Sequence, residues 1–284
     1  FLAEEFKNTP EAFEKLSQYV DLTALMDHLI CQIYQGKSDW PRKNYFLVGD
    51  RTESPRFYFG PWDSEIGFYE STIEVGPKKQ DALNYSPLSS PMFLSDSSGP
   101  GFWLKHLRAS EEFCLMFADR VHELTGENGV LSPNRAGGLY RSLLDELNPL
   151  LLAEALRWGD SRRKVSHRPY GEEWEGLTGK SSWLFTKFFP LRPITLKQHF
   201  REEGLWPELD PPGFYFRNGS KGERKFYLRN PNIRGIIVFT QDGSDPREHW
   251  TGKPRGNAFR EPINPAPGVQ IKARILSHKK WSPM

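Results

Sequence analysis

The stretch "LMDHLICQIYQGKSDWPRKNYFL", Leu25 to Leu47, decides how the first part of the chain folds. Its first half places apolar residues at helical spacing, and Gly36 supplies a stop signal for that helix. Its second half carries a carboxylate and an amide five positions apart, Asp39 and Asn44, immediately before an apolar run. Taken alone, this polar half is typical of a turn that leads into a strand.

The segments on either side of this stretch carry their own start and stop signals. Upstream, Thr9-Pro10 and Asp21 are N-cap signals, which predict a short helix to about Tyr19 and a second helix, buried on one face, that ends at Gly36. Downstream, the runs "NYFLVG" and "RFYFG" are separated by the polar turn "DRTESP", which predicts a β-hairpin. The hairpin leads into "PWDSEIGF", which contains Asp63.

The remaining sequence divides into a helical part and a strand-rich part. Residues 71–100 are rich in Ser, Pro and Gly and predict a long loop, whereas helical patterns cover 102–126, 132–159 and the stretch "TLKQHFREEG" after Pro193. From about Leu205, Pro and Gly punctuate four strand-like runs, "GFYFRNG", "KFYLRN", "GIIVFT" and "VQIKARIL". We therefore expect a multidomain chain, with a mainly α unit over 1–204 and a small all-β sandwich over 205–284.

Composition limits the classes of partner. The 284 residues include 38 basic and 36 acidic side chains, so bulk charge gives no reason to expect binding to nucleic acid or anionic lipid. There is no apolar run of eighteen or more residues, hence no predicted membrane span, and the first residues lack the order of a signal peptide. The two cysteines, Cys31 and Cys114, belong to no Cys/His cluster with metal-ligand spacing.

The order of elements around Asp39 gives that residue a chemical interpretation. In the C-lobe of protein kinases a helix leads to a catalytic loop with Asp-x-x-x-x-Asn, and a metal-binding Asp follows shortly after. The same order occurs here with Asp39, Asn44 and Asp63. Because the two ends of a hairpin lie side by side, Asn44 and Asp63 could share one metal ion, with Asp39 close by.

Several blocks also resemble a known family, the spore-coat CotH kinases, an atypical branch of the protein-kinase-like fold. The resemblance rests on the opening stretch, on "FYFGPWDSEIGF", and on "FWLKHLRASEEF", "FADRVHEL" and "ALRW", and it extends over about residues 5–203. It implies that Asp39 is the acidic residue of the catalytic loop, that Asn44 is a metal-binding amide and that Asp63 is the principal metal ligand, with Glu65 as a further candidate ligand. It further implies Mg²⁺ or Mn²⁺ with ATP as the phosphate donor, Ser or Thr hydroxyls of a protein as the acceptor, and an extracytoplasmic, secreted or cell-surface location.

Two departures from the family pattern bear on these expectations. Glu65 stands where the family has a second Asp, and it could ligate a metal or hydrogen-bond a ligating water. No glycine-rich phosphate loop and no strand lysine paired with a helix glutamate occur in the chain, and "RAGGLY" around Gly137 indicates packing or a turn. We therefore expect the ATP-binding N-lobe upstream of Phe1, and residues 1–284 alone to be inactive as a kinase.

The strand-rich part resembles the chitobiase/β-hexosaminidase C-terminal type of module, an immunoglobulin-like sandwich, through "GIIVFTQDGSDPREHWTG" and "VQIKARILSHKKWSPM". Asp242 and Asp245 are interpreted as turn residues around Gly243, with contact to calcium or sugar as the alternative. The resemblance implies an accessory unit with a glycan or cell-surface partner. The alternative to a kinase is thus a non-catalytic surface scaffold whose β-sandwich binds a glycan or a protein.

Three further groups of residues have simple interpretations. His28 is expected to be a packing histidine, and Trp62 and Trp103 to be core anchors. The basic cluster Arg162, Arg163, Lys164, His167 and Arg168 could clamp a phosphorylated or acidic substrate, or form a solvated loop.

Overall fold

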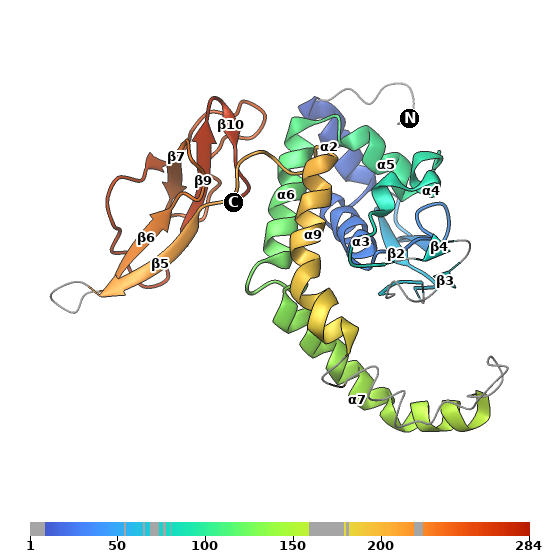
Figure 1. The fold of residues 1–284 in the computed structure, drawn as a ribbon. Helices are drawn as coiled ribbons and strands as arrows, with labels where there is room; N and C mark the ends of the chain where they lie inside the picture. Colours follow the sequence, from blue (N-terminus) through green and yellow to red (C-terminus); the bar gives the residue numbers. More distant parts are fainter. Residues whose placement is uncertain are drawn as a thin grey trace.

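The computed structural model describes residues 9–53, 55–64, 66–68, 74–75, 78–79, 81–158, 179, 182–218 and 224–284. Figure 1 shows a helical region followed by a β region, joined by one connecting segment. Among the described residues of the helical region, β1 and β2 form the larger hairpin, beside α3. This is the mixed, multidomain arrangement expected from the sequence.

The first two helices begin where their caps predict. Helix α2 spans Pro10–Tyr19 with Thr9 as N-cap, and α3 spans Leu22–Tyr34 with Asp21 accepting a bond of 2.9 Å from the Ala24 amide. Helix α3 is buried on more than the one face expected: His28 and Gln32 are buried along with its apolar residues. A helix surrounded in this way is a fixed support for the loop that follows it.

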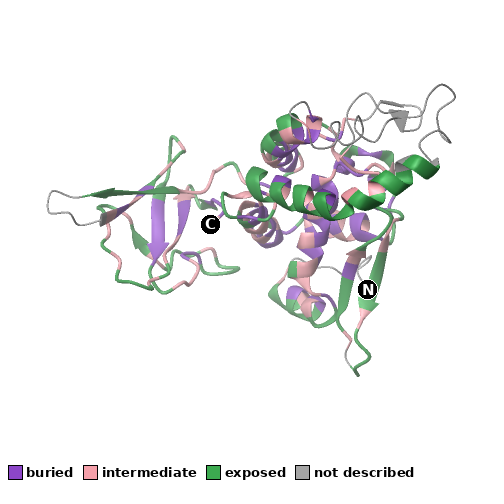
Figure 2. Cartoon of the chain, turned by 90° about the horizontal axis from the view of Figure 1, so that it is seen from below, coloured by how far each residue is buried: buried purple, intermediate pink, exposed green. Residues whose placement is uncertain are grey.

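The predicted hairpin is confirmed, with β1 at Tyr45–Gly49 and β2 at Phe57–Pro61. The strands are antiparallel and pair Tyr45 with Pro61 at one end and Gly49 with Phe57 at the other. In Figure 2 the hairpin is mostly exposed; on β2 only Phe59 is buried.

The segment expected to be one long loop contains short elements of regular structure. These are β3 (Glu74–Val75), β4 (Lys78–Lys79), η1 (Pro87–Ser89) and α4 (Pro91–Leu94). The prediction was wrong over 87–94 because two prolines at first helical positions start single turns, and the Ser90 hydroxyl caps α4 by accepting from the Phe93 amide at 3.1 Å.

The later helices mostly follow the predicted boundaries. They are α5 (Pro100–Leu107), α6 (Glu111–Thr125), α7 (Pro133–Trp158), the π-helical turn η2 (Leu184–Phe188) and α9 (Phe189–Glu202). The expected start of the last helix after Pro193 was wrong, because the buried residues Phe189 and Arg192 anchor one more turn ahead of the proline. None of the described helices is long and apolar enough to cross a membrane.

The β region contains two small antiparallel sheets around a shared core. Strands β5 (Gly213–Asn218) and β6 (Arg224–Arg229) form one sheet, and the second has the order β10-β9-β7-β8. The bounds in the second sheet are β7 Ile236–Thr240, β8 Asn257–Ala258, β9 Lys272–Ser277 and β10 Lys280–Trp281. Side chains from both sheets meet in one cluster that includes Phe226, Phe239 and Ile275.

The turn around Gly243 is built as predicted. Gly243 has φ +76°, and the Asp242 carboxylate accepts bonds from the Ser244 amide at 3.0 Å and hydroxyl at 2.6 Å. Asp245 also accepts from the Arg247 amide, but in addition both of its oxygens accept from the Arg274 guanidinium at 2.7 and 2.6 Å. Asp245 is therefore an ion-pair residue as well as a turn residue.

The two regions meet along α6. Glu112 accepts two bonds from Arg247, at 3.0 and 2.6 Å, and one from the Trp250 amide at 3.1 Å, while Asp119 accepts two from Arg274, at 2.8 and 2.6 Å. Between these acids, Leu115 packs with Val238 and Trp281. One face of α6 thus forms an ion-paired seam with the β region, defined here by Glu112, Leu115 and Asp119.

Candidate active site

The end of α3 is fixed by a buried arginine from α9. The Arg192 guanidinium is fully buried and donates to the carbonyls of Tyr34 at 2.7 Å, Leu83 at 2.6 Å and Tyr85 at 3.2 Å, and also to that of Ile33. Burial lowers the pKa of Arg192 to about 10, so it remains a cation at neutral pH. A cation at a helix C-terminus satisfies carbonyls that the helix leaves without a partner. The loop that contains Asp39 therefore starts from a fixed point.

Asp39 and Asn44 are brought into direct contact. The Asn44 amide nitrogen Nδ2 donates a hydrogen bond to Asp39 Oδ2, and Asp39 is 8% exposed. The second oxygen, Asp39 Oδ1, is buried and has no hydrogen-bond partner in the described part of the chain. Burial raises the pKa of Asp39, although the charges of Lys37 and Lys43 oppose this. A buried carboxylate oxygen without a partner is a candidate for contact with a substrate or a metal ion.

Asn44 and Asp63 lie at the two ends of the hairpin, as expected from the sequence. The Trp62 amide donates to the Asn44 carbonyl at 3.2 Å, one position beyond the last strand pair, Tyr45 and Pro61. Both Asn44 and Asp63 have left-handed backbones, with φ +64° and +50°. Such conformations are uncommon outside glycine and are concentrated at functional sites.

The third residue, Asp63, is near the pair but is not bonded to it. Its side chain is exposed and has no hydrogen-bond partner among the described residues, and its negative charge contributes to the raised pKa of Asp39. The fourth predicted residue, Glu65, lies outside the described residues, as does the basic cluster of residues 162–168. The structure thus joins Asp39 to Asn44 and brings the Asp63 backbone to the same end of the hairpin.

Trp62 was expected in the core, and this prediction was wrong. Its side chain is 65% exposed and meets Phe46 edge to face, with ring centroids 6.4 Å apart. The backbone explains the outcome, because the Trp62 amide and carbonyl are both bonded inward, to Asn44 and to Lys37. Trp103 does pack against the core.

Beneath the loop, Trp40 and His28 form a buried pair. Trp40 is fully buried and its indole Nε1 donates to His28 Nε2 at 3.3 Å. Burial, together with the charge of Lys37, lowers the pKa of His28 to about 4. His28 is therefore neutral at pH 7 and can accept this bond, which confirms its packing role.

A second loop supports the Asp39 loop from outside. Buried Asp96 accepts four backbone bonds, from the amides of Ser98, Gly99, Gly101 and Phe102, at 2.9 to 3.3 Å. A side chain at Gly101 would come within 2.6 Å of Pro41 Cγ, so only glycine permits this approach. Sequence reasoning missed Asp96; the signal available was one acid followed by the small residues "SSGPG".

The oxygen atoms present suit a hard cation such as Mg²⁺. Because Asn44 Nδ2 is directed at Asp39, its Oδ1 is left for a ligand, and the other candidate oxygens are Asp39 Oδ1 and the exposed Asp63 carboxylate. Within the described ranges no three His, Cys, Asp or Glu side chains form a metal-binding cluster, so these ligands would be two acids and one amide. Magnesium is commonly held in this way, by one or two carboxylates and substrate phosphates.

One protein family matches the part of the chain that contains these residues. The family described as CotH kinase protein matches residues 2–178, which is more than half of the chain. The chain belongs to the CotH kinase family. No curated protein and no solved structure matches it. The match includes Asp39, Asn44 and Asp63 and ends before the β region.

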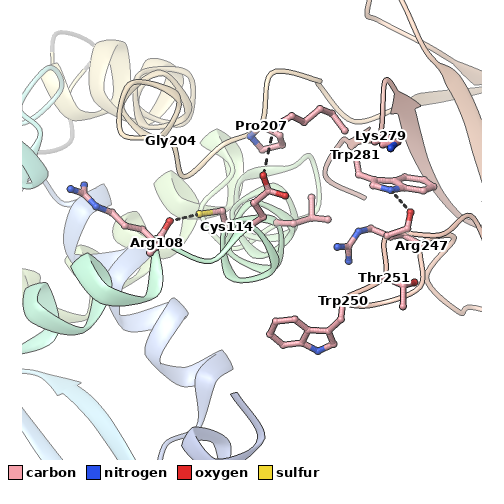
Figure 3. A pocket seen from close by; sticks show the side chains of 14 residues that line it. Arg108, Cys114, Gly204, Pro207, Arg247, Trp250, Thr251, Lys279 and Trp281 are labelled. Carbon is pink, nitrogen blue, oxygen red and sulfur yellow. Dashed lines mark hydrogen bonds and ion pairs between the residues drawn. The ribbon is translucent and has the colours of Figure 1, made fainter. Parts of the chain in front are cut away.

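This CotH chain also has a cavity at the seam, which we do not assign to catalysis. A cavity of about 370 Å³ is lined by residues of both regions, among them Arg108, Cys114, Trp250 and Lys279 (Figure 3). Its arginines already have acidic partners, Arg108 with Glu203 and Arg247 with Glu112. Burial raises the pKa of the Cys114 thiol to about 11, so it is protonated at neutral pH and is a poor nucleophile.

Proposed function

We propose that this CotH-family chain carries the catalytic and metal-binding residues of an atypical protein kinase, which transfers phosphate from ATP to Ser or Thr hydroxyls of surface or secreted proteins. The observation that supports it is the bonded Asp39–Asn44 pair, in which the second Asp39 oxygen is buried and has no partner among the described residues. Family membership supports the kinase-like activity. The extracytoplasmic substrate and location are proposed from the resemblance of the sequence.

Each residue has a role that follows from its position. Asp39 would orient the acceptor hydroxyl and take its proton, and burial brings its pKa closer to neutral pH, as a general base requires. Asn44 Oδ1 and Asp63 would hold Mg²⁺, with Glu65 as a further ligand. The metal would offset the negative charge of the phosphates during transfer. The Asn44 bond to Asp39 keeps the base and the metal ligand in register.

The test is phosphoryl transfer by the full-length protein, with Mg²⁺ or Mn²⁺ and radiolabelled ATP. Asp63→Ala should abolish metal-dependent transfer, because it removes the main proposed ligand of the ion. Asp39→Asn should lower kcat by about 10²–10⁴-fold and leave the KM for ATP nearly unchanged, because a base acts on the hydroxyl. Asp242→Asn, in an exposed turn of the β region, is the matched control. Transfer that is unaffected by Asp63→Ala would contradict the proposal.

We also propose that the β region is an accessory sandwich of the chitobiase type that contacts a glycan at the cell surface. One observation favours this role. The outer face of the β5–β6 sheet presents Tyr215 and Tyr227, stacked at 5.0 Å, with the Arg217 guanidinium 5.1 and 5.7 Å from their ring centroids. Polysaccharide pull-down should be lost on Tyr215→Ala with Tyr227→Ala. If glycan binding is found and transfer is not, the non-catalytic scaffold is the better description.

A further inference from the structure

Lys37 is a fully buried lysine two positions before Asp39. Its ammonium donates to the Trp62 carbonyl at 2.7 Å and to the Ser64 hydroxyl at 3.2 Å. Burying an ammonium group costs free energy unless the group is hydrogen-bonded. A buried lysine at this position therefore indicates a role that an apolar residue of similar length could not fulfil. The two hydrogen bonds of Lys37 indicate what that role is.

The two acceptors are the neighbours of Asp63 on either side. Asp63 has φ +50°, a left-handed conformation that costs roughly 1–2 kcal/mol for a residue with a side chain. A strained backbone of this kind persists only where surrounding contacts hold it. In the described structure, Lys37 holds the residue before Asp63 and the residue after it, 25 and 27 positions along the chain.

The same peptide segment is held from its other side. The Trp62 amide donates to the Asn44 carbonyl at 3.2 Å, so the residue ahead of Asp63 is bonded through both its N–H and its C=O. The bond to Asn44 connects Trp62 to the start of the hairpin. The bond from Lys37 connects Trp62 to the start of the loop that contains Asp39. The position of Asp63 relative to Asn44 and Asp39 therefore depends on the bonds that Lys37 donates.

We propose that Lys37 is a positioning residue that fixes the backbone at Asp63, so that the Asp63 carboxylate meets a divalent cation together with Asn44. This inference rests on the proposed function. Outer groups that orient metal ligands typically contribute 10–100-fold to metal affinity. A plain filling role for Lys37 predicts instead that replacement by Met changes stability alone.

The experiment measures Mn²⁺ binding by electron paramagnetic resonance, with and without ATP, in the 284-residue chain and in its variants. Lys37→Met should weaken Mn²⁺ binding by about 10–100-fold. Lys197→Met is the control, because Lys197 is also partly buried and lies over the Trp206 ring, 4.7 Å from its centroid, among residues that have no proposed part in the site. It should change Mn²⁺ affinity by less than about twofold. Asp63→Asn should abolish binding.

Amide hydrogen exchange supplies a readout that does not need the metal. In Lys37→Met, exchange should speed up locally at the amides of residues 62–64 and stay unchanged in the β region. Ser64→Ala removes one acceptor and leaves Lys37 in place, so it should give a smaller effect in the same direction even if Lys37→Met does not fold.

The outcomes separate the two proposals. If Asp63→Asn abolishes Mn²⁺ binding while Lys37→Met and Ser64→Ala bind as the parent chain does, the role of Lys37 is overturned and the metal site stands. If the parent chain binds Mn²⁺ no better than Asp63→Asn, with and without ATP, the metal site is overturned and the role of Lys37 with it.

Discussion

Buried cations are satisfied differently in the candidate site and at the seam. Around the site, Lys37 and Arg192 donate to backbone carbonyls and one hydroxyl. At the seam, Arg247 and Arg274 donate to the carboxylates of Glu112, Asp119 and Asp245. The seam thus uses its acids to neutralise its own cations, whereas Arg192 at the site donates to backbone carbonyls, and Asp39 Oδ1 and the Asp63 side chain have no hydrogen-bond partner among the described residues. Acids that pair with a buried cation stabilise the fold. An acid whose neighbouring cation bonds to other groups is left to contact a ligand or substrate.

The largest effect is expected from breaking the seam at Arg274. Arg274→Met leaves two acids, Asp119 and Asp245, close together without their common cation. The expected loss is about 3–5 kcal/mol in the free energy of unfolding, measured by urea denaturation. Arg234→Met, at an exposed position, is the control and should be nearly neutral. Equal losses in the two variants would mean that the ion pairs contribute little.

Acid should weaken the same seam through Glu112. Burial raises the pKa of Glu112, but the hydrogen bonds from His249 and Arg247 outweigh this effect and lower the pKa to about 2. Its contribution is therefore complete above the ordinary pKa of 4.5 and is lost as pH falls from 4.5 towards 2, which amounts to roughly 3 kcal/mol. The bond to Glu112 raises the pKa of His249, whose contribution is complete below 6.5 and is lost as pH rises past its raised value. In Glu112→Gln, the free energy of unfolding should fall less steeply as pH drops below 4.5. An equally steep fall in the parent and the variant would refute this.

A somewhat smaller effect is expected when Arg192 is replaced. Arg192→Met leaves four carbonyls around the end of α3 without their donor, and we expect a loss of about 2–3 kcal/mol, because unpaired buried groups are costly. Arg201→Met lies on the same helix but breaks only an exposed pair with Asp210, and it should cost less than about 1 kcal/mol. Amide exchange at residues 33–36 should rise in the first variant only.

The smallest effect on stability is expected at Asp39. Asp39→Asn removes a buried charge whose second oxygen has no partner in the described part of the chain, so the free energy of unfolding should stay within about 1 kcal/mol of the parent or rise. The same change in an acid of the seam, Asp245→Asn, should destabilise the chain, because it breaks the pair with Arg274. Thermal unfolding of both variants measures the contrast, and a larger loss at Asp39 would show that this acid serves stability too.

The sequence predicted local elements better than long-range contacts. Caps and stops gave α2, α3, α6 and the hairpin, because Thr9, Asp21 and Gly126 act within one helical turn of themselves. The hairpin also explains why Asn44 and Asp63 could be placed at adjoining ends. The Asp39–Asn44 contact required only a loop of five positions.

Contacts between distant segments were missed, for a physical reason. Lys37 lies in the polar stretch "QGKSD" and Arg192 in the apolar stretch "FFPLRPI", and only the folded chain shows that each is fully buried and bonded to carbonyls of remote segments. Glu112 and Asp119 share a helix face with Leu115, but their partners come from strands and turns more than a hundred positions away. Periodicity identifies such a face and cannot name what covers it.

The Arg192 contacts also bear on how the site forms during synthesis. Arg192 follows Tyr34 by 158 positions, so at roughly 5–20 residues per second the end of α3 waits on the order of ten to thirty seconds for its cation. Until α9 has left the ribosome, the loop with Asp39 starts from a frayed helix end. The match to the CotH family stops at residue 178, ahead of Arg192. A fragment that ends at residue 178 would contain every proposed ligand but would lack Arg192, which fixes the end of α3.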